Sequence, residues 1–158
     1  MNKQVLTHMT KDPNLVLRKA EPIDQIDKTF KPMGFWYAIG NVWIDWCTSE
    51  MPDWVASYIY TFDILVDNNM LYLNTRETVY EFSQKYGKQV YGHFREVDWQ
   101  QVTEEYDGVE FNPYFYNQRF ATDTLWYNGI DVPSGVIFNT DIILNINRHI
   151  TTNINTLI

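Results

Sequence analysis

The aromatic run Gly34-Phe35-Trp36-Tyr37-Ala38 follows Lys31-Pro32-Met33 in the first third of the chain. A short aromatic run bounded by proline and glycine is typical of a buried strand. The next stretch, Val42 to Cys47, has the pattern of a helix. We therefore predict a strand followed directly by a helix, and the fold class depends on the elements that flank this pair.

The flanking strands are expected to be short. Between Ser57 and Val66 apolar residues recur at every second position, as a pleated strand requires. The apolar run Leu15 to Arg18 lies between two prolines and predicts a buried strand that ends on an arginine. The tail from Ile142 to Ile158 fits a strand followed by a helix. Further strands are predicted at Met70–Leu73, Val109–Phe111, Leu125–Tyr127 and Val136–Phe138, the last after the turn Pro133-Ser134-Gly135.

Two further helices have end signals in the sequence. Thr75 can cap the first of them, and Gly87 can close it in the left-handed conformation. Asp98 and Gln101 have the spacing of a capping box, and Gly108 is expected to end that second helix. The apolar face of the first helix consists of Val79, Phe82 and Tyr86. A loop or short helix is expected around Ile23 to Ile26.

The length and composition of the chain fit one domain. It has 158 residues, of which 45% are apolar and 16% aromatic, and no stretch has the composition of a linker. Many short strands with a few helices, without regular βαβ alternation, predict an α+β fold with mostly antiparallel sheets. We place no internal boundary and treat residues 1–158 as a single domain.

Charge and cysteine content exclude several classes of protein. The net charge of −8 disfavours a protein that coats nucleic acid or anionic lipid. The first 31 residues hold six of the 12 basic residues, whereas Glu96 to Asp141 holds only Arg119. The single cysteine, Cys47, excludes a disulfide framework and suits a reducing compartment. With no apolar signal segment or membrane-length run, a cytoplasmic protein is expected, in the host cytoplasm if it is viral.

Common catalytic motifs are missing from the sequence. The scattered glycines form no phosphate-binding loop. His8, His93 and His149 lie far apart without a second ligand at metal-site spacing, so no metal is expected. Ser134 lacks the surroundings of a hydrolase nucleophile, and Cys47 is interpreted as a packing group rather than a reactive thiolate.

Carboxylates are the remaining candidates for chemistry. Glu104 and Glu105 are adjacent on a predicted helix, which favours a solvated face. Glu110 alternates with apolar residues on a predicted strand, and Asp131 precedes the turn at residues 133–135. A loop position next to a strand favours a functional role for Asp131.

The order of these segments resembles the ADP-ribosyltransferase fold, in particular its poly(ADP-ribose) polymerase-like branch. One family segment is a strand that reads Gly, apolar, aromatic, aromatic, Ala, which Gly34 to Ala38 matches. The helix that follows it in the family carries an aromatic residue that stacks on nicotinamide, and Trp46 stands at that place. The resemblance implies two antiparallel, split sheets with NAD in the cleft between them.

Two further family segments have counterparts with departures. The first segment in the family is a strand that ends in a His or Arg, which binds NAD, followed by Gly and a small polar residue. Leu15 to Arg18 is taken as its counterpart. Lys19-Ala20 follows Arg18 here, in place of the family's Gly and small polar residue. A late strand in the family begins at a catalytic Glu and continues with an apolar run that Gly135 to Asn139 matches. At the Glu position this chain has Ser134, which can donate a hydrogen bond but carries no charge.

The resemblance implies a small NAD-dependent transferase of the bacterial toxin or phage effector type. It would transfer ADP-ribose to a protein or nucleic-acid acceptor and release nicotinamide. The NAD-binding candidates are Arg18, Gly34, Trp36, Tyr37 and Trp46, and the catalytic candidates are Asp131, Ser134 and Glu110. Core packing explains Trp36 better than ligand contact does, and for Arg18 and Tyr37 the two interpretations are about even. The alternative is a non-catalytic binding or inhibitor protein that presents the acidic segment between Glu96 and Asp141 to a basic partner.

Overall fold

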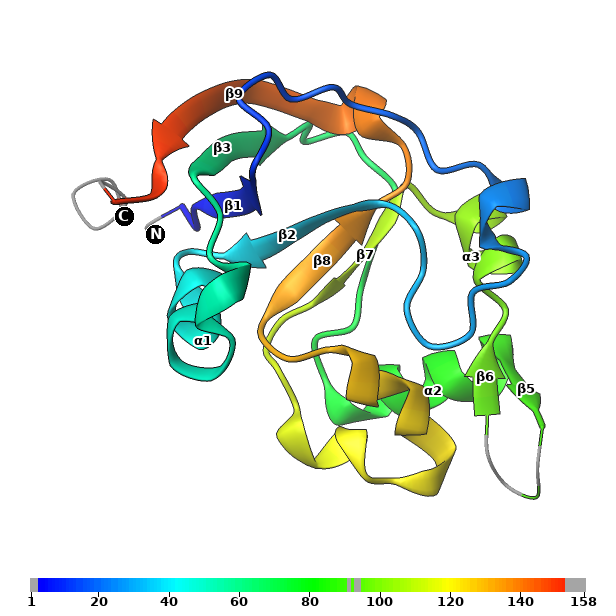
Figure 1. Cartoon of the computed structure of the whole chain (residues 1–158). Coiled ribbons are helices and arrows are strands. Elements are labelled where there is room, and N and C mark those ends of the chain that lie inside the picture. Colours follow the sequence, from blue (N-terminus) through cyan, green and yellow to red (C-terminus); the bar gives the residue numbers. More distant parts are fainter. Residues whose placement is uncertain (1–2, 91, 93–94, 153–158) are drawn as a thin grey trace.

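The computed structural model describes residues 3–90, 92 and 95–152 (Figure 1). Its main element is a seven-stranded sheet in the order β4-β7-β8-β2-β1-β3-β9, and a two-stranded ribbon of β5 and β6 lies beside it. Every neighbouring pair is antiparallel except β4 with β7. The strands are β1 Leu6–Thr10, β2 Phe35–Ile39, β3 Tyr58–Ile64, β4 Met70–Tyr72, β5 Gly87–Gln89, β6 Arg95–Val97, β7 Gly108–Phe111, β8 Ser134–Ile137 and β9 Ile143–Ile150. The predicted α+β class with a mostly antiparallel sheet is confirmed.

The sheet bends where β1 leaves β2. These strands share only two residue pairs, Leu6 with Ile39 and Thr7 with Ala38, whereas β1 and β3 share five. In Figure 1, β1, β3 and β9 lie together, and β8 and β7 run at an angle to them. The two separate sheets that the resemblance implied are thus one continuous sheet with a bend.

Two hydrophobic clusters lie on the two faces of β2 and its neighbours. Trp36 packs against the first cluster, which includes Phe111 and Val136. Tyr37 belongs to the second cluster together with Phe62. Because side chains alternate along a strand, the aromatic run of β2 supplies both clusters. This explains why the run has no polar face.

Three α-helices flank the sheet: α1 Val42–Glu50, α2 Arg76–Tyr86 and α3 Trp99–Glu105. Thr75 caps α2 as predicted, and its Oγ1 accepts a hydrogen bond from the Thr78 N–H at 3.0 Å. Asp98 caps α3 by accepting from the Gln101 N–H at 3.2 Å. None of the helices among the described residues is long and apolar enough to span a bilayer.

The predicted ends of α2 and α3 were wrong in detail. Gly87 has an extended conformation, with φ −76° and ψ 136°, and begins β5 rather than closing α2 in the left-handed region. A Cβ there would lie 2.1 Å from the Ser83 carbonyl oxygen, so close packing requires the glycine. The helix α3 ends at Glu105, and Gly108 begins β7. The Gln101 side chain donates to Glu105 instead of completing a capping box with Asp98.

Two predicted strands were also wrong. Leu15 to Arg18 is an irregular segment in which Val16 is 79% exposed, and the first strand is β1, nearer the N-terminus. The predicted strand at Leu125–Tyr127 lies within a 3-10 helix, η4 Thr122–Gly129. Trp126 and Tyr127 are consecutive and both fully buried. In a strand with one exposed face, consecutive side chains alternate between buried and exposed positions, so these two residues do not fit such a strand. The short helix expected around Ile23 is the 3-10 turn η1, Pro22–Gln25.

The outermost strand, β9, confirms the strand predicted in the tail and is irregular. Its pairing with β3 shifts register, so that Asn145 and Ile146 together face Phe62. Asn145 has a positive φ of 54°, and this residue forms a bulge in the strand. The helix predicted to follow falls mostly on residues 153–158, outside the described residues.

Candidate functional site

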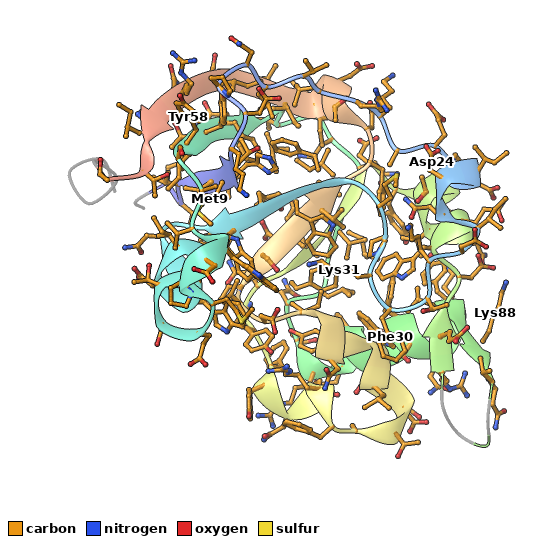
Figure 2. All side chains as sticks on the ribbon, in the orientation of Figure 1. Met9, Asp24, Phe30, Lys31, Tyr58 and Lys88 are labelled. Carbon is orange, nitrogen blue, oxygen red and sulfur yellow. The ribbon has the colours of Figure 1, made fainter. Side chains whose placement is uncertain are left out.

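A cavity of about 200 Å³ lies beside β2, where β1, the start of β8, the segment 129–132 and α1 meet. Four predicted site residues border it: Trp36, Tyr37, Asp131 and Ser134. The remaining lining residues are Thr7, His8, Met9, Lys31, Ala38, Trp43, Gly129, Ile130 and Val132. Figure 2 labels two of these, Met9 on β1 and Lys31 in the segment that leads into β2.

Strand pairing sets one wall of this cavity. Ala38 pairs with Ser134 and with Thr7, so these three side chains share the face of the sheet that Trp36 also occupies. Ser134 is 8% exposed as the first residue of β8. Its hydroxyl has no hydrogen-bond partner among the residues that the structure describes. A nearly buried hydroxyl that opens into a cavity is suited to bind a polar group of a ligand.

Charged groups line the other side. The Lys31 Nζ lies 4.4 Å from the centroid of the Trp36 ring. Burial lowers the pKa of Lys31, and the nearby Asp131 carboxylate partly opposes this effect. Asp131 also forms an ion pair with Arg119, with 3.5 Å between Oδ1 and Nη2. The cavity thus combines an indole surface, one amine and one carboxylate.

His8 borders the cavity, although its ring lies on the face of the sheet that Phe35 and Tyr37 occupy; sequence reasoning found no role for it. Its Nδ1 lies 2.6 Å from the Trp36 carbonyl oxygen, and its ring stacks on Phe35 with centroids 4.2 Å apart. Burial lowers the pKa of His8, an effect that the hydrogen bond to Trp36 partly offsets. The neutral ring must carry its proton on Nδ1 to donate to a carbonyl, which leaves Nε2 as an acceptor.

The signal for His8 was present in the sequence. The resemblance asked for a strand with a His or Arg, then Gly and a small polar residue. His8-Met9-Thr10 lies on the strand that pairs with β2, with Met9 in the place of the glycine. Because β1 contains several polar residues, its sequence does not have the apolar pattern of a buried strand. The first strand was therefore predicted at the more apolar Leu15 to Arg18.

Arg18 and Gly34 border a second hollow, of about 470 Å³, which shares His8 with the cavity. Arg18 is exposed there. Close packing explains why residue 34 is a glycine, because a Cβ at this position would lie 2.5 Å from Cγ2 of Val136. The two predicted NAD-binding residues are thus near one another but outside the cavity.

Trp46 does not border the cavity either. It stacks on Trp43, with centroids 5.0 Å apart and an interplanar angle of 7°, and Trp43 borders the cavity. Cys47, the residue after Trp46, is fully buried, as expected of a packing group. Burial and the charge of Asp131 raise the pKa of its thiol, which disfavours the reactive thiolate.

Glu110 lies on the opposite face of the sheet from Ser134. It pairs with Gly135, whereas Ser134 pairs with Phe111, so the two side chains point to opposite sides. The Tyr37 hydroxyl donates to Oε1 of Glu110 at 2.8 Å. Burial raises the pKa of Glu110, and the hydrogen bond from Tyr37 acts in the other direction. The ring of Tyr37 therefore faces away from the cavity that its strand borders.

Many carboxylates of the acidic segment between residues 96 and 141 are bound to other side chains of the same molecule. Two carboxylates bind tyrosine hydroxyls, Glu105 that of Tyr86 and Glu110 that of Tyr37. Four others form ion pairs: Asp98 with Lys88, Asp123 with Arg95, Asp131 with Arg119 and Asp141 with Lys19. These contacts disfavour one continuous acidic face that imitates nucleic acid.

Comparison with protein-family models, with curated proteins and with solved structures gave no match. Within the described ranges, no three His, Cys, Asp or Glu side chains gather in a group that could hold a metal ion. His93 lies outside those ranges. The candidate site is therefore the cavity with its neighbouring hollow.

Proposed function

We propose that this chain is an ADP-ribosyltransferase-like protein that binds NAD and transfers ADP-ribose to a macromolecular acceptor with release of nicotinamide. The observation that carries the proposal is the cavity beside β2. Trp36 lies far in the sequence from Asp131 and Ser134, and all three residues border it. Three residues chosen from the resemblance thus share one small site.

The size of the cavity supports nicotinamide as its occupant. About 200 Å³ suits one substituted ring, and the rest of a dinucleotide needs further space. The adjoining hollow of about 470 Å³ offers that space, and Arg18 and Lys19 border it. Cationic side chains of this kind suit a pyrophosphate. His8 borders both spaces, so we assign it the NAD-binding role that the resemblance gave to Arg18.

The residues in the cavity have distinct roles in this proposal. Trp36 and Trp43 offer aromatic surfaces for the nicotinamide ring, in place of Tyr37 and Trp46. Ser134 hydrogen-bonds a ribose hydroxyl. Asp131 supplies the negative charge that stabilises the cationic ribose in the transition state, a role that Ser134 cannot fill. Glu110, on the other face, takes no part.

The proposed reaction is a substitution at C1′ of the nicotinamide ribose. The bond between C1′ and the ring nitrogen breaks, and its electron pair returns to the ring, so that neutral nicotinamide leaves. The acceptor nucleophile forms the new bond to C1′ and loses its proton to Asp131, from which the proton passes to water. The substitution changes no oxidation state, so no oxidant or reductant is needed.

The test is calorimetric titration of the purified chain with NAD, followed by measurement of free nicotinamide in the same samples. We expect saturable binding and slow release. His8→Phe keeps the stack on Phe35 but lacks ring nitrogens, and we expect it to weaken binding about tenfold. Asp131→Asn should keep binding and slow release by about 100-fold.

Glu110→Gln is the matched control, because it changes a carboxylate of similar burial on the opposite face. It should leave both NAD binding and nicotinamide release unchanged. Absence of NAD binding would overturn the whole proposal. Binding without release would overturn transfer and leave a non-catalytic NAD-binding protein.

A further inference from the structure

Three tryptophans form an aromatic surface next to the cavity. Trp43 and Trp46 lie on α1, and Trp54 lies on η2, the 3-10 turn Pro52–Trp54 that follows it. The Trp54 ring centroid lies 6.2 Å from that of Trp43 and 6.0 Å from that of Trp46. We call these three residues the tryptophan surface.

The tryptophan surface is open to solvent mainly at Trp54, since Trp43 and Trp46 are half-buried. Trp54 is 51% exposed, and the neighbouring Met51 and Val55 are 38% and 36% exposed. The positions of Trp43, Trp46 and Glu50 along α1 put them on one helical face. Large aromatic side chains at the surface of a protein mark binding sites more often than scattered aliphatic ones.

The surroundings of the tryptophan surface are anionic. Asp45, Glu50 and Asp53 come from the same two elements and are all exposed. None of the ion pairs found among the described residues involves these three carboxylates. The sequence contains no lysine or arginine between Lys31 and Arg76. An indole surface with carboxylates around it attracts a flat cation and repels phosphate.

We propose that the tryptophan surface binds an arginine-bearing segment of a protein partner. A guanidinium group stacks on indole rings and forms paired hydrogen bonds with carboxylates, so both features of the surface suit it. Trp43 also borders the cavity, so a segment bound here lies beside the proposed reaction centre. On the basis of the proposed function, this partner is the ADP-ribose acceptor, which is then a protein rather than a nucleic acid.

The test measures binding of three probes to the full chain by calorimetry and by tryptophan fluorescence. The probes are a short peptide of alternating Arg and Gly, the same peptide with Lys for Arg, and single-stranded oligothymidylate. We expect the arginine peptide to bind in a salt-sensitive manner, about threefold to tenfold more tightly than the lysine peptide. The oligonucleotide should not bind.

Variants locate the binding on the molecule. Trp54→Ala and, separately, Asp53→Lys should each weaken binding of the arginine peptide about tenfold. The control pair is Tyr80→Ala and Glu77→Lys on α2, which change an exposed aromatic residue and an exposed acid at another place. These controls should leave binding unchanged. Asp53→Lys keeps all three indoles, so it remains informative if Trp54→Ala unfolds.

Two results would overturn the assignment. Equal losses in the α2 variants would mean that the peptide responds only to the net charge, and binding of the oligonucleotide would mean that the surface takes nucleic acid. NAD titration of the same samples separates this proposal from the previous one. Peptide binding without NAD binding keeps the docking surface but removes the acceptor role. NAD binding without peptide binding overturns the docking surface and leaves the proposed NAD-dependent function standing.

Discussion

The Tyr37 hydroxyl reaches Glu110 across an intervening strand because Gly135 lies between them without a side chain. Gly135 pairs with Tyr37 on one side and with Glu110 on the other, so the three residues form a row on one face of the sheet. A Cβ on Gly135 would lie 2.2 Å from Cζ of Tyr37. The glycine is thus required by a side-chain contact, since its φ is not in the left-handed region.

Gly135→Ala tests this explanation. The added methyl group should push the Tyr37 ring away, break its hydrogen bond to Glu110 and lower the free energy of unfolding by about 2–4 kcal/mol. Urea denaturation measures the change. Gly129→Ala is the control, because its nearest contact would be an ordinary 3.7 Å to Cβ of Lys31. Equal effects of the two substitutions would show that the row is unimportant.

Tyr37→Phe should have a pH-dependent effect. The hydrogen bond from Tyr37 favours the charged form of Glu110, so its loss raises the pKa of Glu110 further above the ordinary value. A raised carboxyl pKa in the folded state costs stability as pH rises through it. The variant should therefore lose more stability at pH 7 than at pH 4, by about 1 kcal/mol.

Unfolding by urea at the two pH values measures this difference. The second variant is Tyr37→Phe combined with Glu110→Gln, in which the position no longer titrates. The pH dependence of the Tyr37→Phe effect should disappear in that background. A loss that is the same at both pH values with Glu110 present would assign the whole effect to packing of the ring.

At the scale of elements, the sequence signals that worked were periodic and local. Alternation over residues 57–66 predicted β3, and the Thr75 cap with its apolar face predicted α2. Leu15 to Arg18 failed because a short apolar run also occurs where an irregular segment covers the core; Leu15 and Leu17 pack on the second cluster without a strand partner. Local sequence does not distinguish these two cases.

The residues of the candidate site also fall into two groups, those that local sequence predicted and those that it did not. Trp36 and Ser134 were predicted because each belongs to a recognisable strand segment, and the cavity brings them together. His8, Lys31 and Trp43 were not predicted for it, because their places depend on the pairing of β1 with β2 and on how the segment before β2 folds back. Such long-range contacts leave no periodic signal.

The cap of α2 provides a test at this scale. Thr75→Ala removes the oxygen that accepts the Thr78 N–H, and we expect a loss of about 1 kcal/mol in the free energy of unfolding. Thr75→Ser keeps that oxygen and should restore most of the stability. Thermal unfolding followed by circular dichroism measures both variants. Equal losses for alanine and serine would point to the methyl group rather than the cap.

At the scale of the whole molecule, β2 couples the two hydrophobic clusters because its side chains enter both. Trp99 and Trp126 belong to the first cluster, and Phe62 belongs to the second. Damage to one cluster should therefore destabilise the other. Phe62→Ala should cost about 3–5 kcal/mol and shift the unfolding of both clusters together.

Tryptophan fluorescence includes the signal of the first cluster, from Trp99, Trp126 and the adjacent Trp36, and far-ultraviolet circular dichroism follows the whole chain. In Phe62→Ala both signals should shift to the same lower urea concentration. Val102→Ala in the first cluster is the reciprocal control. Two separated transitions in either variant would mean that the clusters unfold independently.

The bulge in β9 bears on how the protein behaves at high concentration. This strand has a strand neighbour on one side only, so its outer edge resembles the growing end of a fibril. The extra residue at Asn145 kinks that edge, and a straight strand from another molecule cannot match a kinked one over its full length. A deletion that straightened β9 would leave the cavity intact but is expected to promote polymerisation, so one irregular residue helps to keep the chains separate.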